Sequence, residues 1–140
     1  MYKLLVPVDG STHADRAVRH VITLHDRGLA IEVLMLNVQP EVVDWQTHGL
    51  ARDAMAAQRD YLCRQATENA RNALDAAGIA YRLQMELGEP AQSIAAIANR
   101  EHCEAIVMGT RGMSGLPGIV LGSVANKVVH IVDVPVTLVK

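Results

Sequence analysis

Apolar residues follow two alternating patterns along the chain. Five short runs are largely apolar, and most of them lack the polar positions of a half-exposed strand, which is typical of strands buried on both faces of a sheet. Between these runs, apolar residues recur every three or four positions, which is the spacing of an amphipathic helix. The pattern predicts strands at 2–8, 31–38, 80–87, 105–108 and 134–139, and helices between 11 and 28 and at 51–77, 91–100 and 123–132.

Local signals mark several ends of these helices. Ser11 or Thr12 can cap the first helix, and glycine at 28 and at 78 is a typical helix stop. Pro90 suits the first turn of the third helix, whereas 39–49 has no clear period and is expected to be a loop. The second helix is expected to bury one stripe, formed by Ala54, Gln58, Tyr61, Leu62, Gln65, Ala66, Ala70, Ala73, Leu74 and Ala77.

The alternation of strands and helices predicts the fold class. Strands that alternate with helices form a parallel sheet covered on both faces, and right-handed crossovers leave few strand orders. The runs around Val6, Leu34 and Val107 are the most apolar and are expected at the centre, whereas 80–87 alternates as an edge strand does. We expect an α/β fold of flavodoxin-like or Rossmann-like type: a three-layer sandwich with a five-stranded parallel sheet, order 3-2-1-4-5, and four helices.

The last strand, from Val134 to Val139, is more apolar than a bare edge strand should be. An exposed apolar edge offers unpaired backbone groups to another chain. We therefore expect a homodimer through this strand. The alternative is an edge that is simply short and protected by loops.

Length and composition narrow the function classes. With 140 residues the chain suits a single domain, 1–140, and 50% of its residues are hydrophobic. The formal net charge of -2 and the pI of about 6.3 argue against nucleic-acid binding, which usually needs a basic face. One Trp, three Tyr and no Phe leave little material for stacking on bases.

Targeting and metal signals are weak. No apolar run is long enough to span a membrane, and Pro7 and Asp9 interrupt the start too early for a signal peptide. We therefore expect a soluble, cytoplasmic protein with no membrane partner. Cys63 and Cys103 form no CxxC pair and are expected to be buried, reduced thiols. The six histidines show no metal-ligand spacing.

Five of the ten glycines lie between Gly109 and Gly122, directly after the fourth strand. In the expected sheet this loop adjoins Asp9, at the point where the strand order reverses and ligands bind. Glycines let the backbone approach an anion, and the start of the next helix, at Ser123, supplies free N–H groups. Asp9 can accept from ribose hydroxyls or hold Mg²⁺ against phosphates. Alternatively, the glycines only shape a tight loop and Asp9 only caps a helix.

Other phosphate and catalytic motifs are missing from the sequence. It contains no GxxxxGK[ST], no GxGxxG after the first strand and no GxSxG. No general base is visibly placed beside a nucleophile. His13 is the histidine nearest to the expected site in sequence, and we expect it to face solvent.

The glycine spacing resembles that of a known family. Gly109-x-x-Gly112, nine residues and then Gly122-Ser123 match the ATP-binding motif of universal stress proteins. Further segments also resemble that family, among them Leu5-Val6-Pro7-Val8-Asp9-Gly10-Ser11 at the first strand and turn, Gly88-Glu89-Pro90-Ala91 before the third helix, Ser114-Gly115-Leu116 in the glycine-rich loop, and Val134-Pro135-Val136 at the end. The resemblance covers the whole chain.

This resemblance implies a five-stranded α/β fold, ATP binding, and a dimer formed by antiparallel pairing of the last strands. It places Pro7, Val8 and Asp9 on the adenosine side, and Val38 where it packs against adenine or hydrogen-bonds it through its backbone. It places Met108 and Gly109 under the nucleotide, and Gly112, Gly122, Ser123 and Val124 at the phosphates. This chain has Ala125 where other members of the family have a residue with a hydroxyl group, and Pro117-Gly118 where they often have basic residues. Both differences remove contacts to the phosphates. Arg111 is the residue that could compensate for them.

The leading hypothesis is a regulatory or stress-response protein that binds ATP or a related adenine nucleotide, with Mg²⁺ held through Asp9. No catalytic residue is assigned, so any hydrolysis would be slow. A second hypothesis is a dimeric interaction module without a nucleotide role. A third is a weak enzyme, either a slow ATPase or an adenylyl-group hydrolase.

Overall fold

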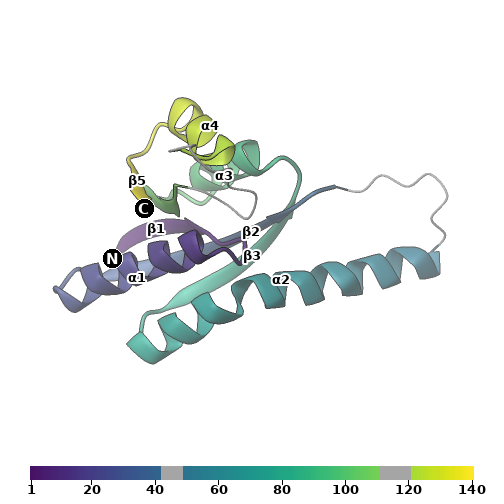
Figure 1. The fold of residues 1–140 in the computed structure, drawn as a ribbon, viewed down its shortest axis with the longest axis horizontal. Helices are drawn as coiled ribbons and strands as arrows, with labels where there is room; N and C mark the ends of the chain where they lie inside the picture. The colour runs from purple at the N-terminus through teal and green to yellow at the C-terminus, as the bar shows by residue number, and fades with distance from the viewer. Residues whose placement is uncertain (42–48, 111–120) are drawn as a thin grey trace.

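Strands and helices alternate through the parts of the chain that the computed structural model describes, residues 1–41, 49–110 and 121–140. The strands are β1 (Tyr2–Pro7), β2 (Ile31–Gln39), β3 (Tyr81–Leu87), β4 (Ala105–Gly109) and β5 (Val136–Val139). The helices are α1 (Thr12–Asp26), α2 (Gly49–Ala77), α3 (Pro90–Arg100) and α4 (Ser123–Ile131). The sheet is parallel, in the order β3-β2-β1-β4-β5 (Figure 1). The expected fold class and strand order are confirmed.

Helices cover both faces of the sheet, which gives three layers (Figure 1). α1 and α2 pack on one face, over a core that includes Val6 and Leu74. α3 and α4 pack on the other, over a core that includes Leu34 and Ile106. Because side chains alternate across a strand, successive residues of the central strands enter the two cores in turn. This explains why the central runs are apolar at nearly every position.

The two edge strands are the expected ones, β3 and β5. β5 begins at Val136, two residues later than the apolar run that starts at Val134. Proline has no N–H to give to a ladder. Pro135 therefore contributes only its carbonyl, which accepts a hydrogen bond from the Ile106 N–H at 2.9 Å.

The stripe expected for α2 is wrong in its first half. Ala54, Gln58 and Tyr61 are exposed, and the Tyr61 side chain retains 55% of its accessible surface. Between residues 52 and 77 of α2, the buried positions are Cys63, Thr67, Ala70 and Leu74. The N-terminal part of α2 extends past the body of the sheet (Figure 1), and the described residues Ala54 and Gln58 of this part stay at the surface.

Both cysteines are buried and free, as the sequence indicates. Burial raises the pKa of the Cys63 and Cys103 thiols. Both side chains are therefore thiols rather than thiolates at neutral pH, and neither is activated as a nucleophile. Within the described residues, no helix combines the length and the apolar character that crossing a membrane requires.

Candidate functional site

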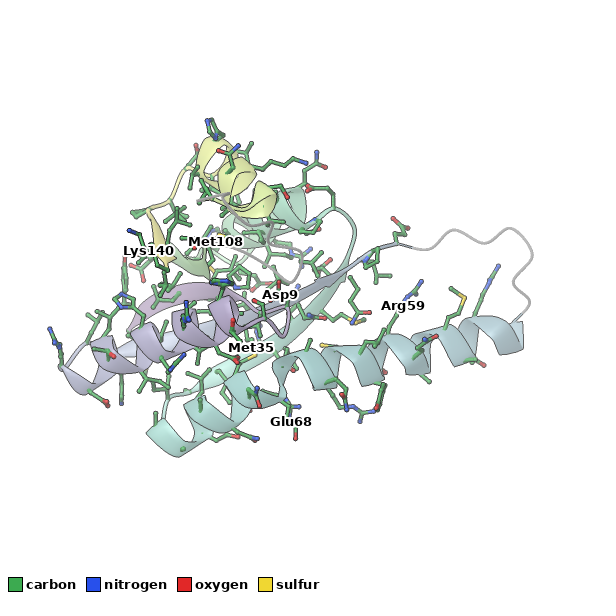
Figure 2. All side chains as sticks on the ribbon, viewed as in Figure 1. Asp9, Met35, Arg59, Glu68, Met108 and Lys140 are labelled. Atoms are coloured by element: carbon green, nitrogen blue, oxygen red, sulfur yellow. The ribbon has the colours of Figure 1, made fainter. Side chains whose placement is uncertain are left out.

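The central strands part at the carboxyl edge of the sheet. The ladder between β1 and β4 pairs Leu5 with Ile106 and goes no further. The ladder between β1 and β2 continues two residues longer, to Pro7 and Leu36. The segments that follow β1 and β4 therefore diverge at the point where the strand order reverses, which is where open α/β sheets bind ligands. Figure 2 labels Asp9 and Met108 close to this edge.

Gly109, the last residue of β4, lies directly against the first turn of α1. A Cβ added to Gly109 would lie 2.7 Å from the Cβ of His13 and 2.8 Å from its backbone carbon, so no larger residue fits without a shift. His13 is half-buried, and its Nδ1 is buried without a hydrogen-bond partner. The expectation that His13 faces solvent holds only in part, because α1 begins against the end of β4 and buries one side of this residue.

Thr110 ties the end of β4 to the start of α4. Its N–H donates to the Val139 carbonyl at 3.0 Å, and its own carbonyl accepts from the Gly122 N–H at 2.6 Å. Gly109 and Gly122 are therefore brought close together, as the sequence predicts. Two predicted site residues, Arg111 and Gly112, lie outside the described residues, as does the Pro117-Gly118 pair.

α1, α3 and α4 start at this edge with N-caps that lie within the described residues, and they differ in how their first N–H groups are satisfied. Ser11, rather than Thr12, caps α1 and accepts from the Ala14 N–H at 3.1 Å. Glu89 caps α3, accepting at 3.2 Å from the Ala91 N–H and at 2.8 Å from the Gln92 N–H. Gly122 caps α4 and offers no side-chain acceptor. A helix start of this kind leaves N–H groups and the positive end of the helix dipole for an anion.

The predicted phosphate residues of α4 sit in its first turn. Ser123 is exposed, Val124 is half-buried and Ala125 is buried in the core beneath α3 and α4. The backbone N–H groups of these residues are those that the first turn of a helix leaves unpaired. Lys127, one turn further on, places its Nζ 3.7 Å from the Oε1 of Glu89.

Asp9 is exposed and held in a turn. Its Oδ1 accepts from the Ser11 N–H at 2.9 Å. Gly10 has a φ of +86°, and a Cβ there would lie 3.3 Å from the Cα of Ala66 on α2. Asp9 therefore does not cap α1, which was the alternative reading of this residue, because Ser11 does so.

The residues predicted to line the adenosine lie on different faces of the sheet. The Val8 side chain is buried under α1 and α2, so that only its backbone borders the edge. Val38 is half-buried and, like Met108, packs on the opposite face with α3 and α4. Pro7 is half-buried at the end of β1. Val38 thus supplies a half-buried aliphatic side chain on the face of the sheet that α4 covers, where Met108 is buried with 5% of its surface exposed.

Two buried amides at the end of β2 were not selected from the sequence. The Asn37 Nδ2 donates to the Val8 carbonyl at 2.9 Å. The Gln39 Nε2 donates at 3.0 Å to the Asn37 Oδ1 and at 3.0 Å to the Arg59 carbonyl of α2. The available signal was their polarity at the end of an otherwise apolar strand, since buried amides are retained where they have partners.

The arrangement suits a small anionic ligand with an apolar body. It combines the uncapped start of α4, the exposed carboxylate of Asp9 and the aliphatic side chains of Val38 and Met108. The backbone donors can hold phosphate oxygens, and the carboxylate can accept from hydroxyl groups or bind a divalent cation. Among the described residues, no group of three His, Cys, Asp or Glu is placed to hold a metal ion without a ligand.

Comparison with known proteins matches residues 1–140 to the family model described as the universal stress protein family. A universal stress protein of Methanothermobacter thermautotrophicus is 31% identical over 141 residues, which cover 99% of this chain and 94% of the relative. Among solved structures, the hypothetical protein MJ0577 of Methanocaldococcus jannaschii has a TM-score of 0.79 at 29% identity, covering 100% of this chain and 96% of that one.

A third similar protein was solved with a ligand. It is a universal stress protein family protein from Arabidopsis thaliana with AMP bound, and its TM-score is 0.73 over 100% of this chain and 92% of that one. At 18% identity, the likeness between the two chains concerns their fold.

Proposed function

The chain belongs to the universal stress protein family, and we propose that it binds an adenine nucleotide, ATP with Mg²⁺, at the carboxyl edge of its sheet. The observation that carries the proposal is the start of α4. Of the three helices at this edge whose N-caps lie within the described residues, α4 is the one without a side-chain cap. Thr110 holds that start against the end of β4.

The phosphates would lie on the first turn of α4, at the N–H groups of Ser123, Val124 and Ala125. These groups match phosphate oxygens in charge and in hydrogen-bonding role. The Ala125 side chain is a methyl group and has no hydroxyl to donate to a phosphate, so this residue contributes only its backbone N–H. Arg111 and Gly112, which stay predictions from the sequence, would add to the same phosphate site.

The nucleoside would lie toward β1 and β2. Val38 offers a half-buried aliphatic side chain on one face, where Met108 is buried in the same core. The Pro7 and Val8 backbone borders the same edge. Asp9 fits a ribose hydroxyl or a Mg²⁺ ion shared with the phosphates, since its carboxylate is exposed and fixed by the Ser11 N–H. The similar protein from Arabidopsis thaliana, which binds AMP, supports an adenine nucleotide as the ligand.

We expect binding to serve regulation rather than rapid hydrolysis. The groups proposed for the phosphates are backbone donors, and no described side chain beside them is assigned as a general base. A ligand series tests the proposal. Calorimetric titration with MgATP, AMP and adenosine should give affinities that fall in that order, because each phosphate lost removes hydrogen bonds to α4. Equal affinities for all three would contradict the phosphate placement, and no binding of any would contradict the function.

We also propose that the protein forms a homodimer through β5. Ile106 N–H donates to Pro135 O, and Thr110 N–H donates to Val139 O. This register turns the backbone groups of Val136 and Leu138 away from β4, toward the open edge. Val136→Pro should remove an outward N–H and split the dimer in light scattering, while Thr137→Pro should disrupt β4 pairing and lower stability instead. A monomeric wild-type protein at micromolar concentration would contradict this proposal.

A further inference from the structure

The ladder between β1 and β2 stops one hydrogen bond earlier than its geometry allows. The Val8 N–H donates to the Leu36 carbonyl at 2.8 Å. In a parallel ladder the next bond would run from the Val38 N–H to the Val8 carbonyl. The pairing ends instead at Pro7 and Leu36. The backbone edge of Val38 that faces β1 is therefore not used by the sheet.

The Asn37 side chain occupies the acceptor that this bond would use. Its Nδ2 donates to the Val8 carbonyl at 2.9 Å, and Asn37 retains only 3% of its accessible surface. A buried carbonyl needs a donor, because leaving it unpaired costs free energy. Asn37 thus satisfies Val8 without consuming the Val38 N–H.

Gln39 determines how the Asn37 amide is oriented. The Gln39 Nε2 gives one hydrogen bond to the Asn37 Oδ1 and one to the Arg59 carbonyl, each at 3.0 Å. With Oδ1 occupied as an acceptor, the Nδ2 of Asn37 must point to Val8. Arg59 lies on α2 (Figure 2), so the pair also fixes the end of β2 to that helix.

We propose that Asn37 and Gln39 are positioning residues for the nucleotide base: they hold the ladder open so that the Val38 N–H and carbonyl remain free to hydrogen-bond an adenine edge. This inference rests on the proposed function for the identity of the ligand. The effect of Asn37 and Gln39 on the Val38 N–H does not depend on that function. The two side chains act through the backbone and need not touch the ligand.

The Val38 N–H and carbonyl, for which no partner is found among the described residues, can also select between bases. The pairing edge of adenine offers an acceptor nitrogen beside an amino donor, which complements the backbone of Val38. Guanine presents a carbonyl acceptor and a ring N–H donor in the reverse order. A site built to make such hydrogen bonds rejects a ligand that leaves them unpaired. We therefore expect the pair to set a preference for adenine over guanine nucleotides.

The test measures the Val38 amide in Asn37→Leu, which keeps the side-chain volume and removes the donor. In the free wild-type protein, the Val38 N–H should exchange rapidly in two-dimensional NMR. In the variant it can close the ladder onto Val8, and its exchange should slow by about tenfold or more, as expected for a newly hydrogen-bonded amide. Unchanged Val38 exchange in the variant would overturn the proposal.

Nucleotide selectivity gives the second readout. The ratio of MgATP to MgGTP affinity should fall by about tenfold in Asn37→Leu. Gln39→Met, which leaves the Asn37 donor in place but frees it to turn, should change both readouts in the same direction by less. It also keeps the test usable if Asn37→Leu fails to fold.

Thr67→Val serves as the matched control, since Thr67 is a buried polar residue of α2 that bonds within its own helix. It should alter neither Val38 exchange nor the affinity ratio, and if it changes both as strongly as Asn37→Leu, the effect is general destabilisation and the proposal fails. A wild-type protein that binds no nucleotide would refute the proposed function, while Val38 exchange would still decide whether Asn37 keeps the ladder open.

Discussion

The starts of α3 and α4 lie on the same face of the sheet and at the same edge, yet they differ in chemistry. Glu89 gives both carboxylate oxygens to the first N–H groups of α3, whereas Gly122 gives α4 no side-chain acceptor. Lys127 of α4 adjoins Glu89, with 3.7 Å between Nζ and Oε1. A filled helix start stabilises the fold, and an open one keeps its donors for a ligand. The N-terminus of α3 therefore serves the stability of the fold, whereas the N-terminus of α4 is proposed to bind a ligand.

An acidic N-cap on α4, like that of α3, should have the largest effect, on the affinity for MgATP. Gly122 has the extended backbone of an N-cap, with φ -67° and ψ 159°, so Gly122→Asp can place a carboxylate on the first N–H groups. It would block and repel phosphates, and MgATP affinity should fall by at least about 100-fold, which corresponds to two or so charge-assisted hydrogen bonds. Thermal unfolding should occur at an equal or higher temperature, because aspartate is a better N-cap than glycine.

The neutral variant Gly122→Asn separates charge from occupancy in this experiment. It offers an acceptor without repelling phosphates, so its loss of affinity should be smaller than that of Gly122→Asp. If Gly122→Asp binds MgATP as tightly as the wild-type protein, the phosphates do not lie on α4.

A side chain at Gly109, where β4 lies against α1, should have the next largest effect, on the stability of the fold. In Gly109→Ala the new Cβ would lie 2.8 Å from the backbone carbon and 2.9 Å from the carbonyl oxygen of His13. The free energy of unfolding should fall by about 1–3 kcal/mol, as for other overpacked sites, measured by urea denaturation. Adding His13→Gly should not restore stability, because the backbone contacts remain. Full rescue by that second change would show that only the His13 side chain is crowded.

Much of the fold could be predicted from local patterns. The apolar runs around Val6, Leu34 and Val107 belong to central strands, and the alternation at 80–87 belongs to an edge. The glycine at the end of β4 and the one before α4 were both correctly placed at one edge. These features depend on short-range periodicity and on the topology that alternating elements impose.

The features that could not be predicted depend on contacts distant in sequence. The environment of His13 comes from β4, and the Asn37 amide bonds a carbonyl 29 residues away. The face of α2 was mistaken because alanine occurs on every side of this helix, so its pattern contrasts little between faces. Tyr61 is exposed whereas Cys63, two residues further on, is buried, so the two side chains lie on opposite sides of α2.

Making α3 resemble α4 should have a smaller effect, and on stability alone. Glu89→Ala removes the acceptor for the Ala91 and Gln92 N–H groups, and the free energy of unfolding should fall by about 1 kcal/mol. Glu89→Asp should retain most of that stability, because aspartate also caps helices well. MgATP affinity should change by less than about threefold in either variant. A loss comparable with that in Gly122→Asp would mean that the start of α3 belongs to the ligand site.

The smallest expected effect is a dependence of stability on acid pH. Hydrogen bonds from the Gln92 N–H, and then the Ala91 N–H, hold the pKa of Glu89 below its ordinary value in the folded chain. A carboxyl whose folded pKa is depressed stabilises the fold above its unfolded pKa of about 4.3 and loses this contribution as pH falls through the lower folded pKa. Urea denaturation should show wild-type protein to be more stable than Glu89→Gln at pH 7, with the difference shrinking toward pH 3. The exposed Glu68→Gln on α2 is the control, and a Glu89→Gln difference that stays constant with pH would show that the ionised carboxylate is not what caps α3.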